Sequence, residues 1–391
     1  MKKSLVALAA LAATGVYAQS TVTIDGIFDA GYAIIDYKGN KASGVNNNGS
    51  STSQLNFRGT QDLGGGLTAN FRFESDFNSV SAYANSGVAS GISSDNKEKS
   101  INNTISTFGN GEVRVGLSSA TLGSVDLGAV NYNSLDAYNA GQPFGTAIGS
   151  GFRTMFINDS QATSQVRADN AIKLKTPNIN GFVGSIYKSA KQTISGTGTL
   201  TQTSTTTGLV VQPNAFSTSM GAYDQYGVSE LAASYANGPL NVSFAQMKND
   251  QLGVSAINTP SGAAGTAEYT ITTLGANYTL GAFKLFGLNQ TVKTNTASVD
   301  KTATTVSGTY TMGNTVLMYQ VGSLRDNVSA KKSTLVGYGV DYNLSKTTAA
   351  YFRAESIDDT ANNMNAAVTP YSVRGSATQF TRTMVGLRVG F

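Results

Sequence analysis

Short stretches in which apolar and polar residues alternate run along the whole of this 391-residue chain. In the stretch LTANFRFESDF, residues 67–77, leucine, alanine and phenylalanine alternate with threonine, asparagine, arginine, glutamate and aspartate. A period of two is the pattern of a β-strand whose two faces meet different surroundings. The sequence therefore predicts an all-β protein in which each strand has one apolar face and one charged face.

The lengths of the connections indicate what the two faces meet. Alternation alone suits a soluble β-sandwich as well as a transmembrane barrel. Here, however, short turn signals alternate with long polar stretches, as in a barrel with one rim of turns and one rim of loops. The short turns are at 62–66, 120–123, 177–181, 237–240, 279–282, 312–314 and 343–346, and the long stretches include 38–52, 79–103, 131–151, 190–228, 249–267 and 359–378.

Seven short turns join fourteen strands, and the first and last strands bring the number to sixteen. We therefore expect a 16-stranded antiparallel transmembrane β-barrel with short periplasmic turns and long external loops. The mean hydropathy is −0.11, and no segment after residue 18 is apolar enough for a membrane-spanning helix. A soluble, secreted all-β domain is the alternative.

The first residues, MKKSLVALAALAATGVYAQS, have the pattern of a secretory signal peptide. Lys2 and Lys3 precede a short apolar run, and Ala18 provides a small residue before a cleavage site at Gln19. We expect residues 1–18 to be removed and residues 19–391 to form the barrel outside the cytoplasm.

The last residues, TRTMVGLRVGF, predict how the barrel closes. Val385, Leu387, Val389 and Phe391 share one face. A barrel must pair its last strand with its first, because an open edge in lipid leaves backbone groups without hydrogen bonds. We therefore expect residues 379–391 to form the closing strand, with Phe391 facing lipid in an aromatic girdle.

Composition argues against several classes of function. The chain has no histidine and no cysteine, which removes Cys/His zinc sites and histidine-containing catalytic triads. No carboxylate spacing indicates a metal site, and we expect no catalytic residues and no cofactor. The 27 Lys and Arg only slightly exceed the 23 Asp and Glu, and two of those lysines lie in the predicted signal peptide. Such a balance gives no basic surface for nucleic acid.

Five motifs, in this order, resemble the trimeric general porins of Gram-negative outer membranes, especially the beta-proteobacterial type. They are QSTVTIDGIFDAG, FRGTQDLGGGLTANFRFE, VGLSSATLGSVDLG, DNAIKLKTPNINGF and YNLSKTTAAY. The resemblance implies a homotrimer in outer-membrane lipid that lets ions and small hydrophilic solutes diffuse passively. It also implies a third loop, at about 131–152, that folds inward and constricts the lumen, and a terminal Phe391 that serves membrane insertion and assembly.

In such porins a basic cluster on the wall faces carboxylates on the third loop. Asp136 and Arg167 match family positions, whereas Gln54, Gly111 and Ala129 stand where arginines are usual. Strand parity places further charges in the lumen. The basic ones are Arg58, Arg72, Arg114, Arg167, Lys173 and Lys175, and the acidic ones are Asp25, Asp29, Glu74, Asp76, Glu112, Asp126 and Asp169.

Arg58, Arg114, Asp136, Arg167, Lys173 and Lys175 are the candidate pore-lining residues. Arg167, Lys173 and Lys175 lie on one strand just after the third loop and could form a basic ladder. From this ladder we predict a weak preference for anions.

Three alternatives remain beside a general porin. A substrate-specific channel could use the aromatic residues of the third loop, Tyr132, Tyr138, Phe144, Phe152 and Phe156, to stack on solutes, although these residues could equally pack the loop against the wall. A surface adhesin could use the long stretch 190–228, and a barrel enzyme would need a catalytic pair that the sequence does not show.

Three segments are apolar on both faces, which is typical of strands at a subunit contact. They are 282–293, 349–355 and 316–322.

Overall fold

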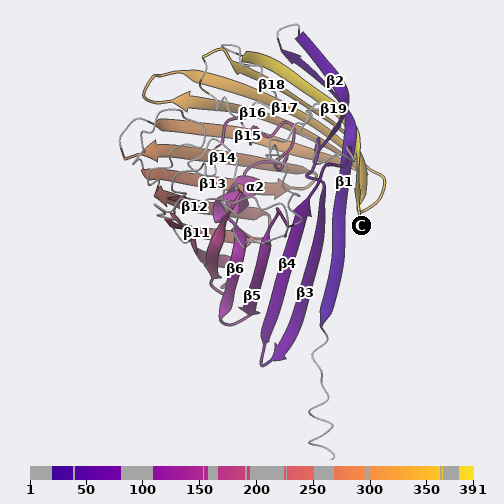
Figure 1. Cartoon of the computed structure of the whole chain (residues 1–391). Helices are drawn as coiled ribbons and strands as arrows, with labels where there is room; N and C mark the ends of the chain where they lie inside the picture. The colour runs from indigo at the N-terminus through magenta and orange to yellow at the C-terminus, as the bar shows by residue number, and fades with distance from the viewer. Residues whose placement is uncertain are drawn as a thin grey trace, which may run out of the picture.

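The strands follow one another around a barrel (Figure 1). The computed structural model describes residues 20–37, 40–80, 109–152, 154–156, 166–189, 192–193, 224–225, 227–250, 268–295, 299–361, 363 and 378–391. The predicted signal peptide and most of the long stretches 79–103, 190–228, 249–267 and 359–378 lie outside these residues. The elements are β1 (Thr21–Tyr37), β2 (Asn40–Asn47), β3 (Gln54–Gly64), β4 (Leu67–Asp76), β5 (Val113–Ser119), β6 (Gly123–Asn131), α2 (Asn133–Ala140), β7 (Arg167–Lys175), β8 (Phe182–Ser189), β9 (Gln192–Thr193), β10 (Asp224–Gln225), β11 (Gly227–Asn237), β12 (Leu240–Asp250), β13 (Glu268–Leu280), β14 (Phe283–Thr294), β15 (Asp300–Met312), β16 (Thr315–Asp326), β17 (Lys332–Asn343), β18 (Thr348–Asp359) and β19 (Thr378–Gly390).

Antiparallel pairing closes the sheet on itself. Within the described residues the main sheet has 17 strands, and β1 pairs with both β3 and β19. Because β2 and β3 lie end to end beside β1, they occupy one position in the wall, and the barrel is 16-stranded. The predicted fold class is therefore confirmed. The closing contact also includes the final residue, since Gly26 and Phe391 exchange two backbone hydrogen bonds of 3.2 Å.

The seven predicted short turns all join neighbouring strands at one rim of the barrel. Gly281 and Gly313 open two of these turns with φ of 59° and 56°, a conformation that costs glycine little. The prediction of a long loop at 38–52 is wrong in part, because 40–47 form β2, which pairs with β1 from Ala30 to Tyr37. β1 has 17 residues, more than the roughly 9–11 needed to cross a membrane, so its C-terminal half extends beyond the turn-to-turn wall and requires a partner strand of its own.

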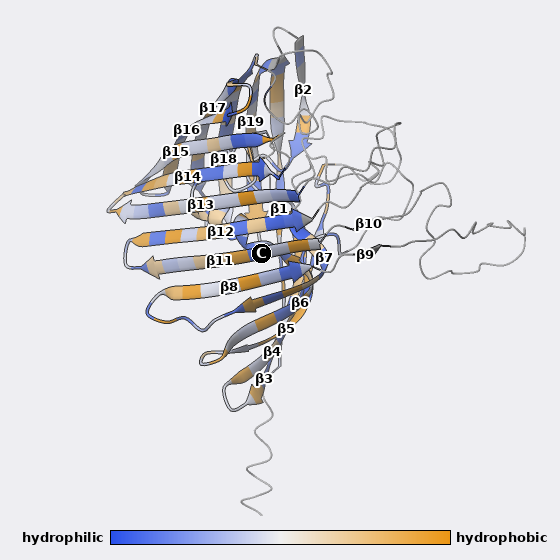
Figure 2. Cartoon of the chain, turned by 90° about the vertical axis from the view of Figure 1, so that its left-hand side faces the viewer, coloured by the Kyte–Doolittle hydropathy of each residue, from blue (hydrophilic) through white to orange (hydrophobic). Residues whose placement is uncertain are grey.

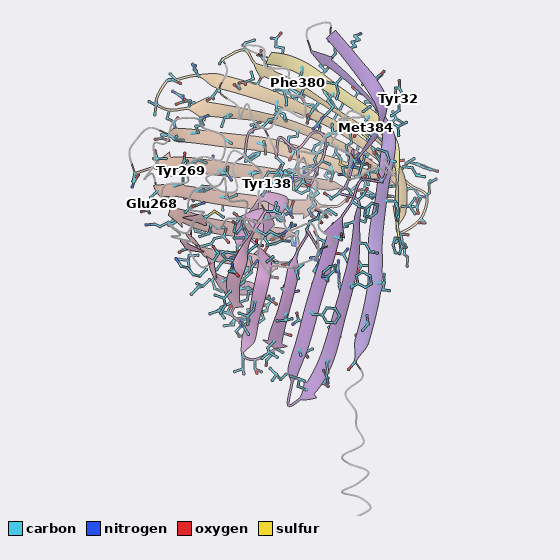
Figure 3. The ribbon with its side chains drawn as sticks, in the orientation of Figure 1. Tyr32, Tyr138, Glu268, Tyr269, Phe380 and Met384 are labelled. Atoms are coloured by element: carbon cyan, nitrogen blue, oxygen red, sulfur yellow. The ribbon has the colours of Figure 1, made fainter. Side chains whose placement is uncertain are left out.

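The two faces of the wall differ as the alternation predicts. Apolar and polar bands alternate along the strands in Figure 2. On β1, Val22, Phe28 and Tyr32 are exposed on the outer face, whereas Asp29 and Ala33 point inward and are fully buried. Tyr32 lies on the outer side of β1 in Figure 3. An apolar outer face of this kind is what a lipid-embedded barrel presents.

The second apolar face of β14, one of the three strands with two apolar faces, packs inside the barrel. On β14, Phe286, Leu288 and Val292 point inward and are buried. Leu288 packs in a cluster with Tyr138, Phe152 and Phe156 of the segment after β6. The second apolar face of this strand therefore packs against a segment inside the barrel.

Candidate functional site

Residues 131–152 and 154–156 lie inside the barrel and run across its inner wall. The helix α2 lies within the ring of strands in Figure 1 and contacts β11, β12 and β13. The inward-folded third loop predicted from the resemblance is thus present. Among the residues that the structure describes, no helix has the length and apolar character needed to cross a membrane.

A buried carboxylate holds the beginning of α2. The Glu230 side chain on β11 accepts hydrogen bonds from the backbone N–H groups of Asn133, at 2.5 Å, and Ser134, at 2.7 Å. Glu230 is only 2% exposed. The first N–H groups of a helix lack partners within the helix and carry a partial positive charge, so a carboxylate there is stabilising. Glu230 therefore fixes α2 to the wall.

The far end of the segment is held on the opposite side of the barrel. The backbone N–H of Gly149 donates to Glu355 of β18 at 2.7 Å, and the Gln320 amide of β16 donates to the carbonyls of Gly149 and Ser150. Two glycines in the wall allow the backbone of the inward-folded segment to lie directly against the strands. A Cβ on Gly275 would lie 1.8 Å from the Ala137 carbonyl oxygen, and one on Gly337 would lie 2.4 Å from that of Gly149.

The aromatic residues of this segment pack it against the wall. Tyr138 lies on α2 inside the barrel in Figure 3, and its ring is edge-on to Phe152 and Phe156 at 4.8 and 5.0 Å. Burial raises the pKa of the Tyr138 hydroxyl far above its ordinary value, so it stays neutral and donates to the Ser150 carbonyl at 3.0 Å. Tyr132, Tyr138, Phe144, Phe152 and Phe156 are all 2% exposed or less. None of these rings presents a stacking surface to a solute.

Asp136 is the acidic residue of the inward-folded segment that faces water. Its side chain is 57% exposed, and it pairs with Lys173 at 3.4 Å. The tip contributes no comparable group, because the Gln142 side chain is 2% exposed and folds back to the Phe144 N–H and the Gly145 carbonyl.

The inner wall from β3 to β7 carries a network of paired charges. Arg72 lies between Glu74 and Glu112, and Arg114 lies between Glu112 and Asp126. The Arg72–Glu112 and Arg114–Asp126 contacts are 2.8 and 2.6 Å. Because each arginine has a carboxylate partner, this wall presents little net charge to the lumen. Arg58, which is 47% exposed, also has a partner in Asp25, at 3.1 Å.

The three residues of the predicted ladder have different surroundings. Arg167 reaches Glu74 at 3.5 Å and thus joins the network. Lys173 is 5% exposed and donates to the Asn131 carbonyl as well as to Asp136. Lys175 lies beside Ser124 on the lumen face near the short-turn rim and is half-buried. The three residues therefore differ in their partners: Arg167 and Lys173 have carboxylates within 4.0 Å, and Lys175 has none among the described residues.

A bulge explains one parity error. The pairing of β6 with β7 shifts between Gly128 and Val130, and Asn170 has a φ of 52°. The extra residue turns Asp169 to the outer face, where it lines a recess with Leu127 and Ile172. The prediction that Asp169 faces the lumen is therefore wrong, because parity changes across a β-bulge.

The positions where the chain lacks family arginines are not equivalent. Gln54 lies opposite Asp76 on the lumen side. Gly111 lies against Glu74, where a Cβ would come within 2.3 Å of the Glu74 side chain. Ala129 pairs with Val113 on the outer face, so the residue there does not alter the lumen.

Sequence reasoning missed the charged residues on β18 and β19. Arg353 pairs with Asp341 at 2.7 Å and lies over the Phe144 ring at the tip of the inward-folded segment. Arg382 pairs with Glu355 at 2.8 Å. Arg388 lies beside Asp29 in the pairing of β19 with β1. The alternation of MVGLRVGF already put Arg388 on the inner face, but 349–355 has two apolar faces, and the distance of these side chains from the inward-folded segment was not visible.

Comparisons with known proteins show the family to which this chain belongs. The model of a family described as Gram-negative porin matches residues 4–362. Outer membrane porin protein 32 of Delftia acidovorans is 33% identical over 301 residues, which cover 75% of this chain and 70% of the relative. An outer membrane porin of Bordetella pertussis is 29% identical over 199 residues, 46% of each chain. In structure, the anion-selective porin from Comamonas acidovorans matches with a TM-score of 0.67 and 25% identity, over 95% of this chain and 100% of that one. The closed barrel, its inward-folded segment and these likenesses together show that this chain belongs to the Gram-negative porin family and forms a channel in the outer membrane.

Proposed function

We propose that this porin is a homotrimeric, water-filled channel for passive diffusion of ions and small hydrophilic solutes, with residues 131–152 as its constriction and a weak preference for anions. One observation carries the proposal. The inward-folded segment is held to the wall at both ends, by Glu230 and by Glu355, so it narrows the lumen at a fixed place. We also propose that residues 1–18 are removed on export.

A general channel suits the lumen better than a substrate-specific one. A specific channel needs exposed groups that recognise its solute, and aromatic rings are the usual stacking surfaces. Here the rings of the constriction are buried against the wall, and the charges from β3 to β7 neutralise one another. Solutes would then be sorted mainly by size and only weakly by charge.

Two observations support the anion preference. The Comamonas porin that this barrel resembles is described as anion-selective. In addition, Lys175, Lys284 and Arg388 face the lumen without a carboxylate within 4.0 Å among the described residues. Charges at a pore wall act on passing ions through the field they create in the lumen.

The selectivity is testable in a planar bilayer with the purified protein under a potassium chloride gradient. We expect a reversal potential that favours chloride and insertion currents that can be divided into thirds. Currents without a threefold substructure would contradict the trimer, and a reversal potential that favours potassium would contradict the selectivity. The absence of any current would contradict the channel itself.

Substitution of Arg167 tests the charge network. In Arg167→Gln the Glu74 carboxylate keeps only Arg72 as a basic partner, so the lumen becomes more negative. We expect the chloride-to-potassium permeability ratio to fall by up to about fifteenfold, because a unit charge about 5 Å from the ion path in water favours an anion by about 0.8 kcal/mol and disfavours a cation by the same amount. Lys248→Gln, which removes an outward-facing charge that is 59% exposed, is the control and should leave the ratio unchanged. An unchanged ratio in Arg167→Gln would show that this network does not set the selectivity.

A further inference from the structure

We propose that Arg388 and Ser50 form an oxyanion-binding site on the lumen wall, which receives the carboxylate or phosphate group of a permeating solute. Arg388 lies on β19, and Ser50 lies between β2 and β3, where the chain returns toward the wall. The inference rests on the proposed anion preference, because it names residues that would produce it. It adds a distinction between anions of different shape, which a charge on the wall alone would not make.

Arg388 lacks the carboxylate partner that the fold places next to it. The register sets Asp29 directly beside Arg388, a position in which opposite charges usually pair. Asp29 is instead fully buried, and its oxygens are already occupied. Oδ1 accepts from a backbone N–H at 3.0 Å and from the Tyr351 hydroxyl at 2.6 Å, and Oδ2 accepts from backbone N–H groups at 2.9 and 2.8 Å, all three N–H groups belonging to residues 49–51. A carboxylate has about four acceptor positions, so none is left for Arg388.

The contact that the described residues give the Arg388 guanidinium is a single long hydrogen bond, from Nη1 to Ser50 Oγ at 3.4 Å. A guanidinium has five N–H donors in a flat fork, which matches the two oxygens of a carboxylate or phosphate. The half-buried Arg388 side chain therefore keeps most of its donors for a solute.

Ser50 supplies a second donor in a fixed place. Its Oγ accepts from Arg353 Nη2 at 3.0 Å as well as from Arg388 Nη1. Because the oxygen accepts two hydrogen bonds, the hydroxyl hydrogen remains to donate. Arg353 is itself immobile, since its side chain is 3% exposed and pairs with Asp341. An oxyanion beside Arg388 can thus accept from the guanidinium and from the Ser50 hydroxyl together.

The site lies beside the proposed constriction. The backbone N–H of Ile148 donates to the Gly49 carbonyl at 3.4 Å, which joins the tip of the inward-folded segment to the residue before Ser50. Arg353, which holds Ser50, lies over the Phe144 ring of the same tip. Solutes that pass the tip of the segment therefore pass within reach of Arg388.

The test compares chloride, acetate and phosphate as potassium salts across planar bilayers that contain the purified protein. Arg388→Gln should lower the chloride-to-potassium permeability ratio by up to about fifteenfold, as for the loss of one unit charge about 5 Å from the ion path in water, which acts on the anion and the cation in opposite directions. Arg388→Lys should keep that ratio but lower the acetate-to-chloride and phosphate-to-chloride ratios, because an ammonium has no fork. Ser50→Ala should lower the same two ratios without a change of charge.

Lys188→Gln is the matched control, because Lys188 also bonds a serine hydroxyl, that of Ser229 at 2.6 Å, but on the outer face. It should change none of the ratios. A response of acetate alone, or of phosphate alone, would support the site and restrict it to that group. If Arg388→Lys and Ser50→Ala both leave the oxyanion-to-chloride ratios unchanged, the inference fails. An unaltered channel that favours potassium would contradict the proposed anion preference, while the ratios between anions would still test the site separately.

Discussion

Replacement of Glu230 by alanine is expected to release the beginning of α2 from the wall and to make the open channel noisy. The two N–H groups that Glu230 accepts, at 2.5 and 2.7 Å, would lose their partner inside a packed contact. Each buried donor left without an acceptor costs roughly 1–3 kcal/mol, so α2 should lose about 2–6 kcal/mol of local stability. The barrel itself should remain, because its strand pairing does not involve this side chain.

Two measurements check this expectation. Amide hydrogen exchange in residues 133–140 should become at least about tenfold faster, since each 1.4 kcal/mol of local stability changes the rate by about tenfold. Single-channel recordings should show a broader distribution of conductance. Glu230→Gln should have an intermediate effect, because its amide retains one acceptor oxygen but turns N–H donors toward the backbone.

Glu268→Ala is the control for the loss of a carboxylate. Glu268 lies at the outer edge of β13 in Figure 3 and pairs with Lys248 at 3.5 Å, where both side chains are exposed. Exposed pairs of this kind contribute about 0–1 kcal/mol, so neither exchange in α2 nor conductance should change. If the amides of α2 in Glu230→Ala exchange at the rate of the unaltered protein, other contacts hold α2, and the proposed constriction does not depend on this carboxylate.

The sequence predicts the wall of the barrel far better than its interior, and the reason is the range of the interactions. Period-two alternation is local, so it correctly placed Arg72, Arg114 and Glu112 on the lumen face. The same rule failed at Asp169, because one extra residue at a bulge changes the side of the wall, and nothing in the alternation marks the bulge.

Contacts between the wall and the inward-folded segment join residues that are far apart in the chain. Glu230 lies 97 positions from Asn133, and Glu355 lies 206 positions from Gly149. Parity gives the side of the wall but not the height, so the sequence could place a carboxylate in the lumen without showing which loop it meets. For the same reason the sequence predicted only that Arg388 belongs to the closing strand. Its position beside Ser50 could be seen only in the folded structure.

Gly275 is another residue whose role the sequence could not predict. Its substitution is expected to have the second large effect on the channel. A glycine within a strand usually reads as a weak point. Here the missing Cβ is what lets α2 lie on β13, because a Cβ would be 1.8 Å from the Ala137 carbonyl oxygen and 2.8 Å from the Gly141 nitrogen. Both atoms belong to the backbone, so no side-chain rotation can relieve the overlap in Gly275→Val.

The helix must therefore move into the lumen by about 1–2 Å to restore an ordinary separation of about 3.5 Å. Overpacking of this kind costs roughly 1–3 kcal/mol, which a long barrel ladder can absorb without unfolding. The cross-section of the lumen becomes smaller, so single-channel conductance should fall. In a liposome swelling assay with uncharged solutes of increasing size, the rate of swelling should begin to fall at a smaller solute size than in the unaltered protein.

Gly287→Val separates this effect from the general cost of valine at a glycine in the sheet. Gly287 lies on the neighbouring strand β14 and pairs with Ala276 of β13, and a Cβ on Gly287 would meet nothing within 4 Å. Conductance and size cut-off should therefore stay at their original values in this variant. If Gly275→Val also leaves both unchanged, α2 does not lie in the path of the solutes, and the constriction must be formed by the tip near Phe144 and Gly149 instead. If both variants lower conductance equally, the effect comes from the wall, and the close approach of α2 to β13 does not determine the pore size.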